Sequence, residues 1–301
     1  MSQRTGLSCT AKRLRYLIID ISIYKIVLGA IQGITEWLPI SSQALVLVTN
    51  GIFDPDTSFG NLVYFALTLH LGTCLSSLIY YRSRIFKIFK NAFVSKSKSY
   101  HELVFYIITT ISSFISALPI FIFIIFVDEI SEMVGVIGMI VLGLIYLTGG
   151  IFQYFGAKRL NINITENRKL YYEYRDKDIS NATNKDGIII GLIQGFSIIP
   201  GMSRSGLTIT SLLLRGFNKT ESLNISFLLG IPVTLVAGVT GLIYLTEILF
   251  IDILAIIISF LIGYLSIKFF ITMANKIEFY SFVIFLGLMV LVSSGIYLLI
   301  A

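Results

Sequence analysis

The residues with the clearest chemical potential lie between positions 187 and 216, where an arginine stands between two serines inside an otherwise apolar run. A charged side chain at membrane depth loses its hydration, so Arg204 is expected to face a polar cavity or a charged ligand. Its neighbours Ser203 and Ser205 offer hydroxyl groups, and either could cap a helix that continues to Leu214. Free backbone N–H groups at a helix start, two hydroxyls and one guanidinium together favour a phosphate ligand.

A second polar pair lies near the other end of the chain. Gln32 and Glu36 are four residues apart, hence on one face of a helix and about 6 Å from one another. Their oxygen donors suit Mg²⁺ or Ca²⁺ better than Zn²⁺, with water and a substrate phosphate completing the coordination. The pair therefore predicts a divalent-cation site. The alternative is that Gln32 and Glu36 bond across helices and that Glu36 pairs with Arg204.

Hydroxyl groups follow this pair closely, at Ser41 and Ser42. A single serine in a membrane helix usually bonds to its own turn or to a neighbouring helix. Two serine pairs, one beside Arg204 and one beside Glu36, instead indicate a nucleophile and a phosphate cradle. His70 lies within an apolar span, where a lone histidine is expected to be a hydrogen-bonded packing residue.

The two polar segments resemble one another, which indicates an internal repeat. The triplet Ile-Gln-Gly occurs at 31–33 and again at 193–195, and a proline and a serine pair follow each copy. Broken segments at corresponding positions of two repeats mark a binding site near the membrane midplane in transporter-like folds. Residues 26–38 give roughly 20 Å of helix, against a hydrocarbon core of about 30 Å. We therefore expect this segment to enter the membrane and turn back, and Pro200 to interrupt its counterpart.

The composition of the whole chain places these segments in a membrane protein. Of 301 residues, 55% are hydrophobic and 13% are charged, which excludes an ordinary soluble enzyme and favours an all-α polytopic membrane protein. The net charge of +6 does not predict a nucleic-acid partner, because the basic residues lie in loops between apolar spans. Six ordinary spans are expected, at 60–81, 103–127, 133–155, 222–247, 252–273 and 280–300.

The charged loops predict how the spans are arranged. The basic loop 82–101 and the polar stretch 156–186 should both be cytoplasmic. Alternation from these loops makes the two halves inverted-topology repeats, each a re-entrant helix pair plus three transmembrane helices, with their broken tips at the midplane. We thus expect a single membrane domain, 1–301, in which 156–186 is a cytoplasmic linker between a first repeat, 26–155, and a second, 187–301.

At these residues the chain resembles a known family of membrane enzymes. The segments QGITEWLPISS at 32–42, PGMSRSG at 200–206 and SFLLGIP at 226–232 are similar to the signatures of the undecaprenyl-diphosphate phosphatase family, also called bacitracin-resistance proteins. The similarity covers nearly the whole chain. It implies an enzyme that removes the terminal phosphate of a polyprenyl diphosphate at the outer face of the cell membrane, with a divalent cation. Such a reaction recycles the lipid carrier for cell-envelope glycan synthesis.

The resemblance also implies roles for single residues. Gln32 and Glu36 would occupy the metal and diphosphate pair, and Glu36, Ser42 and Arg204 would be the catalytic residues. The phosphate would be bound by Ser41, Ser203, Arg204 and Ser205.

One position departs from the family pattern. The family signature continues with a catalytic histidine three residues after the second serine, whereas this chain has Leu45, which cannot transfer a proton. Either another base acts, with Glu36, a metal-bound hydroxide or His70 as candidates, or hydrolysis is slow or absent. The alternative function is a polyprenyl-phosphate translocase or binding protein without hydrolysis. The prenyl chain length and the oligomeric state stay open, with a homodimer as one option.

Overall fold

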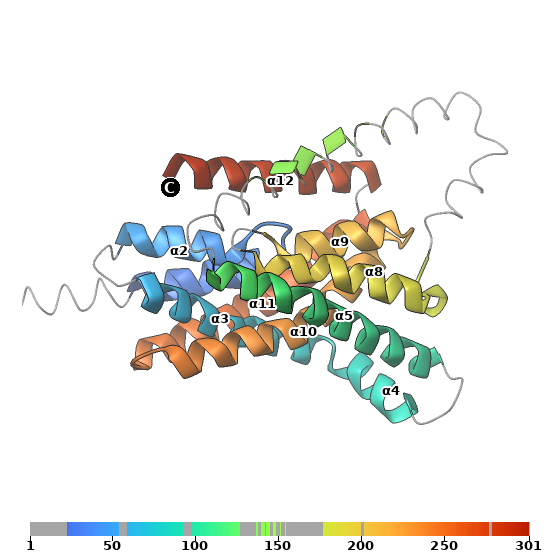
Figure 1. Ribbon diagram of the computed structural model, residues 1–301, viewed down its shortest axis with the longest axis horizontal. Coiled ribbons are helices and arrows are strands. Elements are labelled where there is room, and N and C mark those ends of the chain that lie inside the picture. Colours follow the sequence, from blue (N-terminus) through green and yellow to red (C-terminus); the bar gives the residue numbers. More distant parts are fainter. Residues whose placement is uncertain are drawn as a thin grey trace, which may run out of the picture.

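The computed structural model describes residues 23–53, 59–92, 98–126, 177–199, 202–276 and 279–300, and a few positions between 137 and 154. Within these ranges the chain is helical, apart from turns and an isolated bridge between Lys177 and Phe217 (Figure 1). The predicted all-α class is therefore confirmed for the described part of the chain.

The helices follow one another in the order in which the sequence analysis expects apolar segments. A first helix, Ile23–Thr35, precedes the labelled ones. These are α2 (Ser42–Phe53), α3 (Phe59–Tyr80), α4 (Arg82–Ala92), α5 (Lys98–Phe126), η1 (Ile179–Asn181), α8 (Asn184–Gly195), η2 (Phe196–Ile198), α9 (Arg204–Leu214), α10 (Lys219–Tyr244), α11 (Phe250–Lys276) and α12 (Phe279–Ile300).

Four described helices, α3, α5, α10 and α11, are long and apolar enough to cross a membrane. This finding agrees with the expected multi-pass membrane protein. The expected bounds of three spans match α3, α10 and α11 within a few residues, whereas α5 begins five residues earlier than expected, at Lys98. The expected span 133–155 lies largely outside the described residues.

Both polar segments are interrupted as expected. The first helix ends at Thr35, and a turn leads to Ser42, where α2 begins. In the second segment α8 ends at Gly195, and α9 starts at Arg204 after a short 3-10 turn; Pro200, the expected cause of the break, lies outside the described residues. Ser203 caps α9, because its Oγ accepts a hydrogen bond from the backbone N–H of Gly206 at 3.1 Å.

Each short helix packs on a long helix from the other half of the chain, at points where glycine lets the backbones touch. A β-carbon at Gly29 of the first helix would lie 2.3 Å from the carbonyl oxygen of Ala255 in α11. A β-carbon at Gly191 of α8 would likewise lie 2.3 Å from the carbonyl oxygen of Thr109 in α5. Since no larger residue fits at these distances, the two contacts fix the positions of both broken segments.

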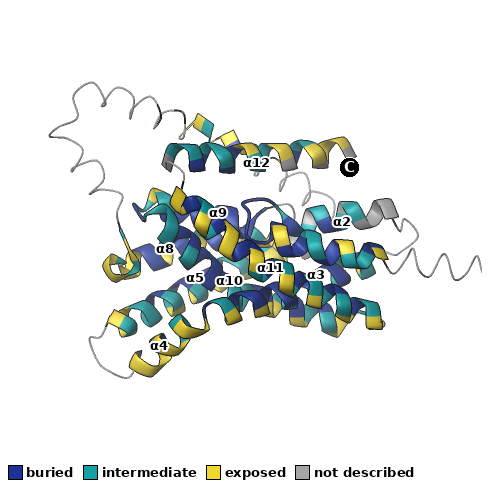
Figure 2. Cartoon of the chain, turned by 180° about the vertical axis from the view of Figure 1, so that it is seen from behind, coloured by how far each residue is buried: buried dark blue, intermediate teal, exposed yellow. Residues whose placement is uncertain are grey.

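The turn between the first helix and α2 lies in the protein interior. Trp37 in this turn is 1% exposed and packs edge-on against Phe227 of α10, with ring centroids 5.0 Å apart. Buried residues lie on the faces with which α3, α10 and α11 pack against one another (Figure 2). The irregular backbone of the break is therefore surrounded by protein, as a non-helical segment at membrane depth requires.

Ion pairs hold the starts of both short helices. Lys25 of the first helix donates to Asp252 of α11 at 2.6 Å. In the second half, the fully buried Asp186 accepts hydrogen bonds from Lys177 and from Arg215 Nε, the latter at 2.7 Å. Residues 177–186, part of the expected linker, are thus held against the end of α9.

Candidate functional site

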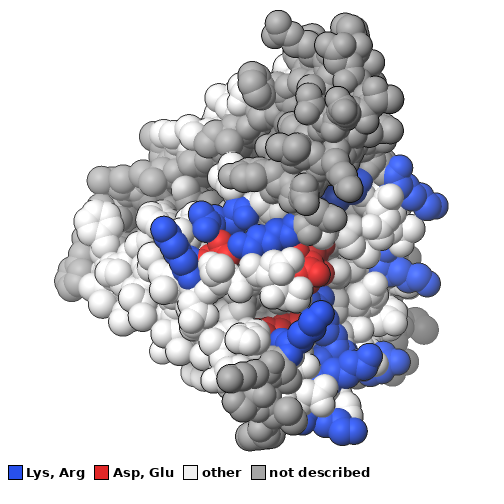
Figure 3. All heavy atoms as spheres, turned by 90° about the vertical axis from the view of Figure 1, so that its right-hand side faces the viewer, with Lys and Arg blue, Asp and Glu red and all other residues white. Residues whose placement is uncertain are grey.

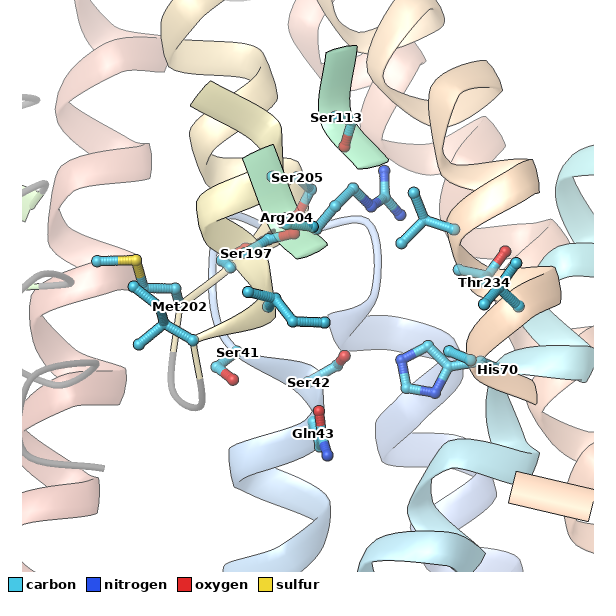
Figure 4. Close-up of a pocket in the computed structure, with 18 of the residues that line it drawn as sticks. Ser41, Ser42, Gln43, His70, Ser113, Ser197, Met202, Arg204, Ser205 and Thr234 are labelled. Atoms are coloured by element: carbon cyan, nitrogen blue, oxygen red, sulfur yellow. Dashed lines mark hydrogen bonds between the residues drawn. The ribbon is translucent and has the colours of Figure 1, made fainter. Parts of the chain in front are cut away.

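A cavity of about 530 Å³ lies between the two broken segments and the helices α3, α5 and α10. Its volume is in the range of small-molecule sites. Six of the seven predicted site residues line it, and His70 joins them (Figure 4). These lining residues are Glu36, Ser41, Ser42, His70, Ser203, Arg204 and Ser205.

The centre of the site is a buried ion pair between the two halves of the chain. Arg204 Nη2 donates to Glu36 Oε1 at 2.7 Å, and Arg204 Nη1 donates to the carbonyl oxygen of Ser226 at 2.8 Å. Arg204 is 8% exposed and Glu36 is 6% exposed, and Nε of Arg204 has no hydrogen-bond partner among the described residues. The pairing that the sequence analysis held as the alternative is thus present, and it compensates two charges that would be costly alone.

The other carboxylate oxygen of Glu36 is surrounded by donors from its own segment. Glu36 Oε2 accepts hydrogen bonds from Gln32 Nε2 and from Ser42 Oγ, each at 2.8 Å. Gln32 is fully buried and does not line the cavity, so it orients Glu36 from behind. Its Oε1 has no hydrogen-bond partner in the described part of the structure.

The second serine pair is bound to the break of the first segment. Ser203 Oγ donates to the carbonyl oxygen of Leu38 at 3.3 Å, and Ser205 Oγ donates to the same oxygen. The two serine oxygens are 3.1 Å apart. These hydroxyls therefore join the two tips, and their role in phosphate binding stays a prediction.

His70 was expected to be a packing residue, and the structure instead places it on the cavity wall. Its Nδ1 lies 3.2 Å from the carbonyl oxygen of Ala66, which is the geometry of a donated hydrogen bond within α3. Its Nε2 lies 3.4 Å from Glu36 Oε2. An imidazole with one nitrogen anchored and the other facing a carboxylate can carry a proton in and out of the site. The signal in the sequence was the rarity of ionisable residues in membrane spans, which applies to His70 as well as to Arg204.

Gly230 of α10 is a further site residue that sequence reasoning missed. A β-carbon there would lie 2.7 Å from Arg204 Nη2 and 2.8 Å from Nη1 and Cζ. Only glycine leaves room for the guanidinium in its present position. The signal was its place within SFLLGIP, which the sequence analysis quoted without asking why a glycine stands there.

The wall opposite the polar residues is apolar and belongs to α5 and α10. Phe114, Leu118 and Phe121 of α5 and Val236 of α10 line the cavity, and each also has a large exposed fraction, between 42% and 60%. Because both helices are candidate membrane spans, this wall faces lipid on its outer side. The cavity thus combines a polar end with an apolar side that a lipid chain can reach.

Comparisons with known proteins show the family to which the chain belongs. Residues 25–292 match the family model described as "Bacitracin resistance protein BacA". The chain belongs to this family. Among its relatives, a protein named "Undecaprenyl-diphosphatase" from Methanococcoides burtonii is 32% identical over 275 residues, which cover 88% of this chain and 95% of the relative.

Two further members of the bacitracin-resistance family are similarly related. An "Undecaprenyl-diphosphatase" from Saccharolobus islandicus (strain M.14.25) is 34% identical, over 74% of this chain and 75% of its own. One from Methanococcus maripaludis (strain C7) is 33% identical, over 81% of this chain and 87% of its own.

Leu45, where the bacitracin-resistance signature has a histidine, does not line the cavity. It is partly buried and packs against the apolar cluster that contains Trp37 and Phe227. The start of α2 therefore offers the site a hydroxyl at Ser42 but no imidazole. Among the described residues that line the cavity, His70 supplies the imidazole ring.

The second polar segment has its own glutamine network without an acid. Gln194, the counterpart of Gln32, donates to Ser113 Oγ of α5 at 3.2 Å and accepts from Thr208 Oγ1 of α9 at 3.0 Å. Four residues further on, this chain has Ile198 in place of a second glutamate. One half of this family member thus supplies the acid and the other supplies the arginine.

Proposed function

We propose that this chain hydrolyses undecaprenyl or a similar polyprenyl diphosphate to the monophosphate and inorganic phosphate, and so recycles a lipid carrier for cell-envelope glycan synthesis. The observation that carries the proposal is the cavity in which Arg204, Glu36 and Ser42 meet beside a lipid-facing apolar wall. The printed name of the related proteins, undecaprenyl-diphosphatase, supports the same reaction.

The substrate would lie with its diphosphate at the polar end and its prenyl chain along α5 and α10. Arg204 uses Nη1 and Nη2 within the protein, and its Nε together with the second hydrogens of both amino groups stays available to phosphate oxygens. The apolar wall would bury the first isoprene units, which have no polar group to satisfy. The combination selects an amphiphile with an anionic head over a free phosphate ester.

In the reaction, Ser42 Oγ or a water molecule in its place attacks the terminal phosphorus in line with the bridging oxygen. The new bond joins the attacking oxygen, from Ser42 or water, to the terminal phosphorus. The bond between the terminal phosphorus and the bridging oxygen breaks, which releases the polyprenyl monophosphate. Glu36, 2.8 Å from Ser42 Oγ, takes the hydroxyl proton, and His70 exchanges it with the solvent. Where the serine attacks, water then hydrolyses the phosphoserine. Arg204 neutralises the charge that develops on the phosphoryl oxygens.

A divalent cation, Mg²⁺ or Ca²⁺, is part of this proposal. The unpartnered Oε1 of the buried Gln32 and the carboxylate of Glu36 are hard oxygen donors that suit such an ion. The described residues contain no group of three or more His, Cys, Asp or Glu side chains that could hold a metal by themselves. Gln32 and Glu36 would therefore hold the ion together with substrate and water oxygens, and the bound ion would neutralise the diphosphate.

The proposal also assigns the arrangement of the chain in the cell membrane. Two inverted repeats, each with a re-entrant pair, are supported by the reciprocal packing of the first helix on α11 and of α8 on α5. The basic loops then lie in the cytoplasm and the cavity opens to the outer face. A homodimer is not needed for the reaction, because every residue that the mechanism uses comes from one chain.

Phosphate release from a polyprenyl diphosphate by the purified protein in nanodiscs tests the function. We expect release that depends on Mg²⁺ or Ca²⁺ and that an Arg204→Ala variant lacks. Tight binding of polyprenyl phosphate without any release would contradict hydrolysis and favour the translocase instead.

A further inference from the structure

The helix α4 lies outside the site and connects two candidate membrane spans, so we expect it at the level of one membrane surface. It begins directly after the candidate span that ends at Tyr80 and lies before the one that begins at Lys98. Figure 1 shows it at one end of the bundle, beside the start of α5, and Figure 3 shows lysine and arginine side chains gathered at this end. Its sequence, RSRIFKIFKNA, is too short and too polar to cross a bilayer.

Around the axis of α4 the side chains form a protein-facing sector, a phenylalanine sector that the exposed Arg82 shares at the N-terminal end of the helix, and a basic sector. Ile88 is 5% exposed and faces the protein, as does Arg84, which donates to Glu102 at 2.7 Å and to Glu221 at 2.6 Å. Phe86 and Phe89 are three residues apart, hence on one face, and are 67% and 58% exposed. These two rings are therefore apolar surface that the described part of the chain does not cover.

The third sector is basic. Lys87 and Lys90 are exposed and, at about 100° per residue, point roughly a quarter turn away from the phenylalanine pair. Neither lysine forms an ion pair with a described residue, whereas Arg84 is fully engaged. No acidic residue occurs from Arg82 to His101. Cations beside uncovered aromatic rings, on a helix at membrane-surface level, are the pattern of an interfacial helix that prefers anionic lipid.

We propose that α4 is an interfacial anchor that binds anionic phospholipid headgroups, with Phe86 and Phe89 in the acyl region and Lys87 and Lys90 on the phosphates. The partner is the leaflet that surrounds the protein, and charge complementarity with the acid-free basic sector selects its anionic lipids. The network of Arg84 with α5 and α10 holds the helix in the orientation that presents both sectors at once. This binding is independent of the proposed hydrolysis.

Quenching of a tryptophan on α4 by brominated lipids tests the proposal. The Phe89→Trp variant would be reconstituted with brominated phosphatidylglycerol or brominated phosphatidylcholine at equal mole fraction. The native Trp37 is buried, so the parent protein supplies the background. Since each basic residue near an anionic surface contributes roughly a fivefold preference, we expect the relative binding constant to favour phosphatidylglycerol by at least about that factor.

Paired charge variants locate the source of the preference. Lys87→Gln and Lys90→Gln, added to the Phe89→Trp variant, should bring the binding constant for phosphatidylglycerol relative to phosphatidylcholine close to one. Quenching itself should persist, because the rings stay in the acyl region. Replacing Lys185 and Lys276, exposed lysines outside α4, by glutamine should leave the ratio unchanged. Equal quenching by both lipids in the Phe89→Trp variant with both lysines present would overturn the headgroup preference. Absence of quenching by either lipid would show that water or a second copy of the chain covers the rings.

Discussion

Arg204 serves two partners with one guanidinium. Such a group has five N–H donors, and Arg204 uses Nη1 for the Ser226 carbonyl and Nη2 for Glu36, with Nε unused. A flat, rigid fork can hold both internal bonds and still offer donors to a diphosphate, whereas an ammonium group offers a single point of charge. The site therefore depends on the shape of the cation as well as on its charge.

Arg204→Lys should consequently lower kcat/KM by at least about tenfold although the charge is kept, because planar two-point contact is lost. Arg215→Lys, which changes an arginine at the far end of α9, is the matched control and should retain activity. Steady-state kinetics of both variants in nanodiscs would measure the difference. An Arg204→Lys enzyme with parental kcat/KM would refute the clamp.

Glu36→Gln should lower hydrolysis and abolish its stimulation by Mg²⁺ or Ca²⁺, because an amide keeps the volume but neither takes the Ser42 proton nor supplies a charge to the cation. The same change leaves Arg204 buried without its counter-charge, so we also expect lower thermal stability. Titration of the rate with each metal, alongside a thermal unfolding curve, separates the two effects. A folded variant that still responds to metal would count against a cation at this carboxylate.

His70→Gln should reduce kcat about 100-fold or more if the imidazole transfers protons, since a positioned general acid or base is typically worth that much. Glutamine keeps a polar group beside the Ala66 carbonyl but cannot carry a proton. His101→Gln, at the exposed histidine on α5, serves as the control and should change little. Parental turnover in His70→Gln would contradict a proton exchange between Glu36 and the solvent through His70.

Residue types were enough to identify Arg204 and Glu36, because an ionisable group in an apolar run is expensive and needs a reason. They gave the pairing of Glu36 with Arg204 as one of two alternatives, but not the partners of the serines. That Ser203 and Ser205 share the carbonyl oxygen of Leu38 depends on the direction of the backbone in a buried turn, which no side-chain pattern encodes. The position of His70 beside Glu36 could not be predicted, because it depends on how α3 packs against the turn that follows the first helix.

At the level of helices, α10 contributes to the site through the absence of a side chain at Gly230. Pro232 lies within α10, two residues after Gly230, and Gly230 leaves the volume into which the guanidinium of Arg204 extends from α9. A helix without a side chain at this point can lie directly against a charged group from its neighbour. The two broken segments and α10 thus have to be considered as one unit.

Gly230→Ala should displace the guanidinium, because the new β-carbon would lie within 2.8 Å of three of its atoms. We expect kcat/KM to fall by more than about tenfold, while the better helix propensity of alanine offsets part of the packing strain. Gly295→Ala in α12, where a β-carbon meets nothing within 4 Å, is the matched control and should be neutral or stabilising. Equal kinetics for the two variants would show that Arg204 adapts freely.

The spans could be predicted because length and hydropathy follow directly from the thickness of a bilayer. The long helix that each short segment contacts could not be predicted. Gly29 and Gly191 reveal that a backbone comes close, but not that its partner is α11 in one case and α5 in the other. This choice is made by the packing of the whole bundle, to which every helix contributes.

At the scale of the whole molecule, the ion pairs of Asp186 with Lys177 and Arg215 hold the start of the second half of the chain against the end of α9. Burial works to raise the pKa of Asp186, but hydrogen bonds from Lys177, Thr183 and Arg215 outweigh it and hold that pKa well below its ordinary value. A depressed pKa stabilises the folded state at every pH above the ordinary value of about 4, and this contribution is lost as the pH falls below it.

Asp186→Asn should therefore lower the unfolding temperature by a similar amount from pH 5 to pH 8, and the gap to the parent should narrow below about pH 4. Thermal unfolding of both proteins in detergent, from pH 8 down to pH 2, would measure this difference in unfolding temperature. Asp178→Asn, at an exposed acid on the neighbouring turn, is the control with a smaller expected effect. A gap that stays constant down to pH 2 would contradict the role of the carboxylate charge.

The packing of the first helix on α11 also constrains the order of events during biosynthesis. Lys25 and its partner Asp252 are 227 residues apart, and Glu36 and Arg204 are 168 apart. A ribosome adds about 5 to 20 residues per second. It therefore needs roughly 10 to 45 s between synthesis of the first residue of such a pair and synthesis of the second. Throughout that interval the nascent N-terminal segment has neither its packing surface nor its counter-charge. We therefore expect the candidate site to form only after the last third of the chain, which contains Arg204 and Asp252, has been synthesised.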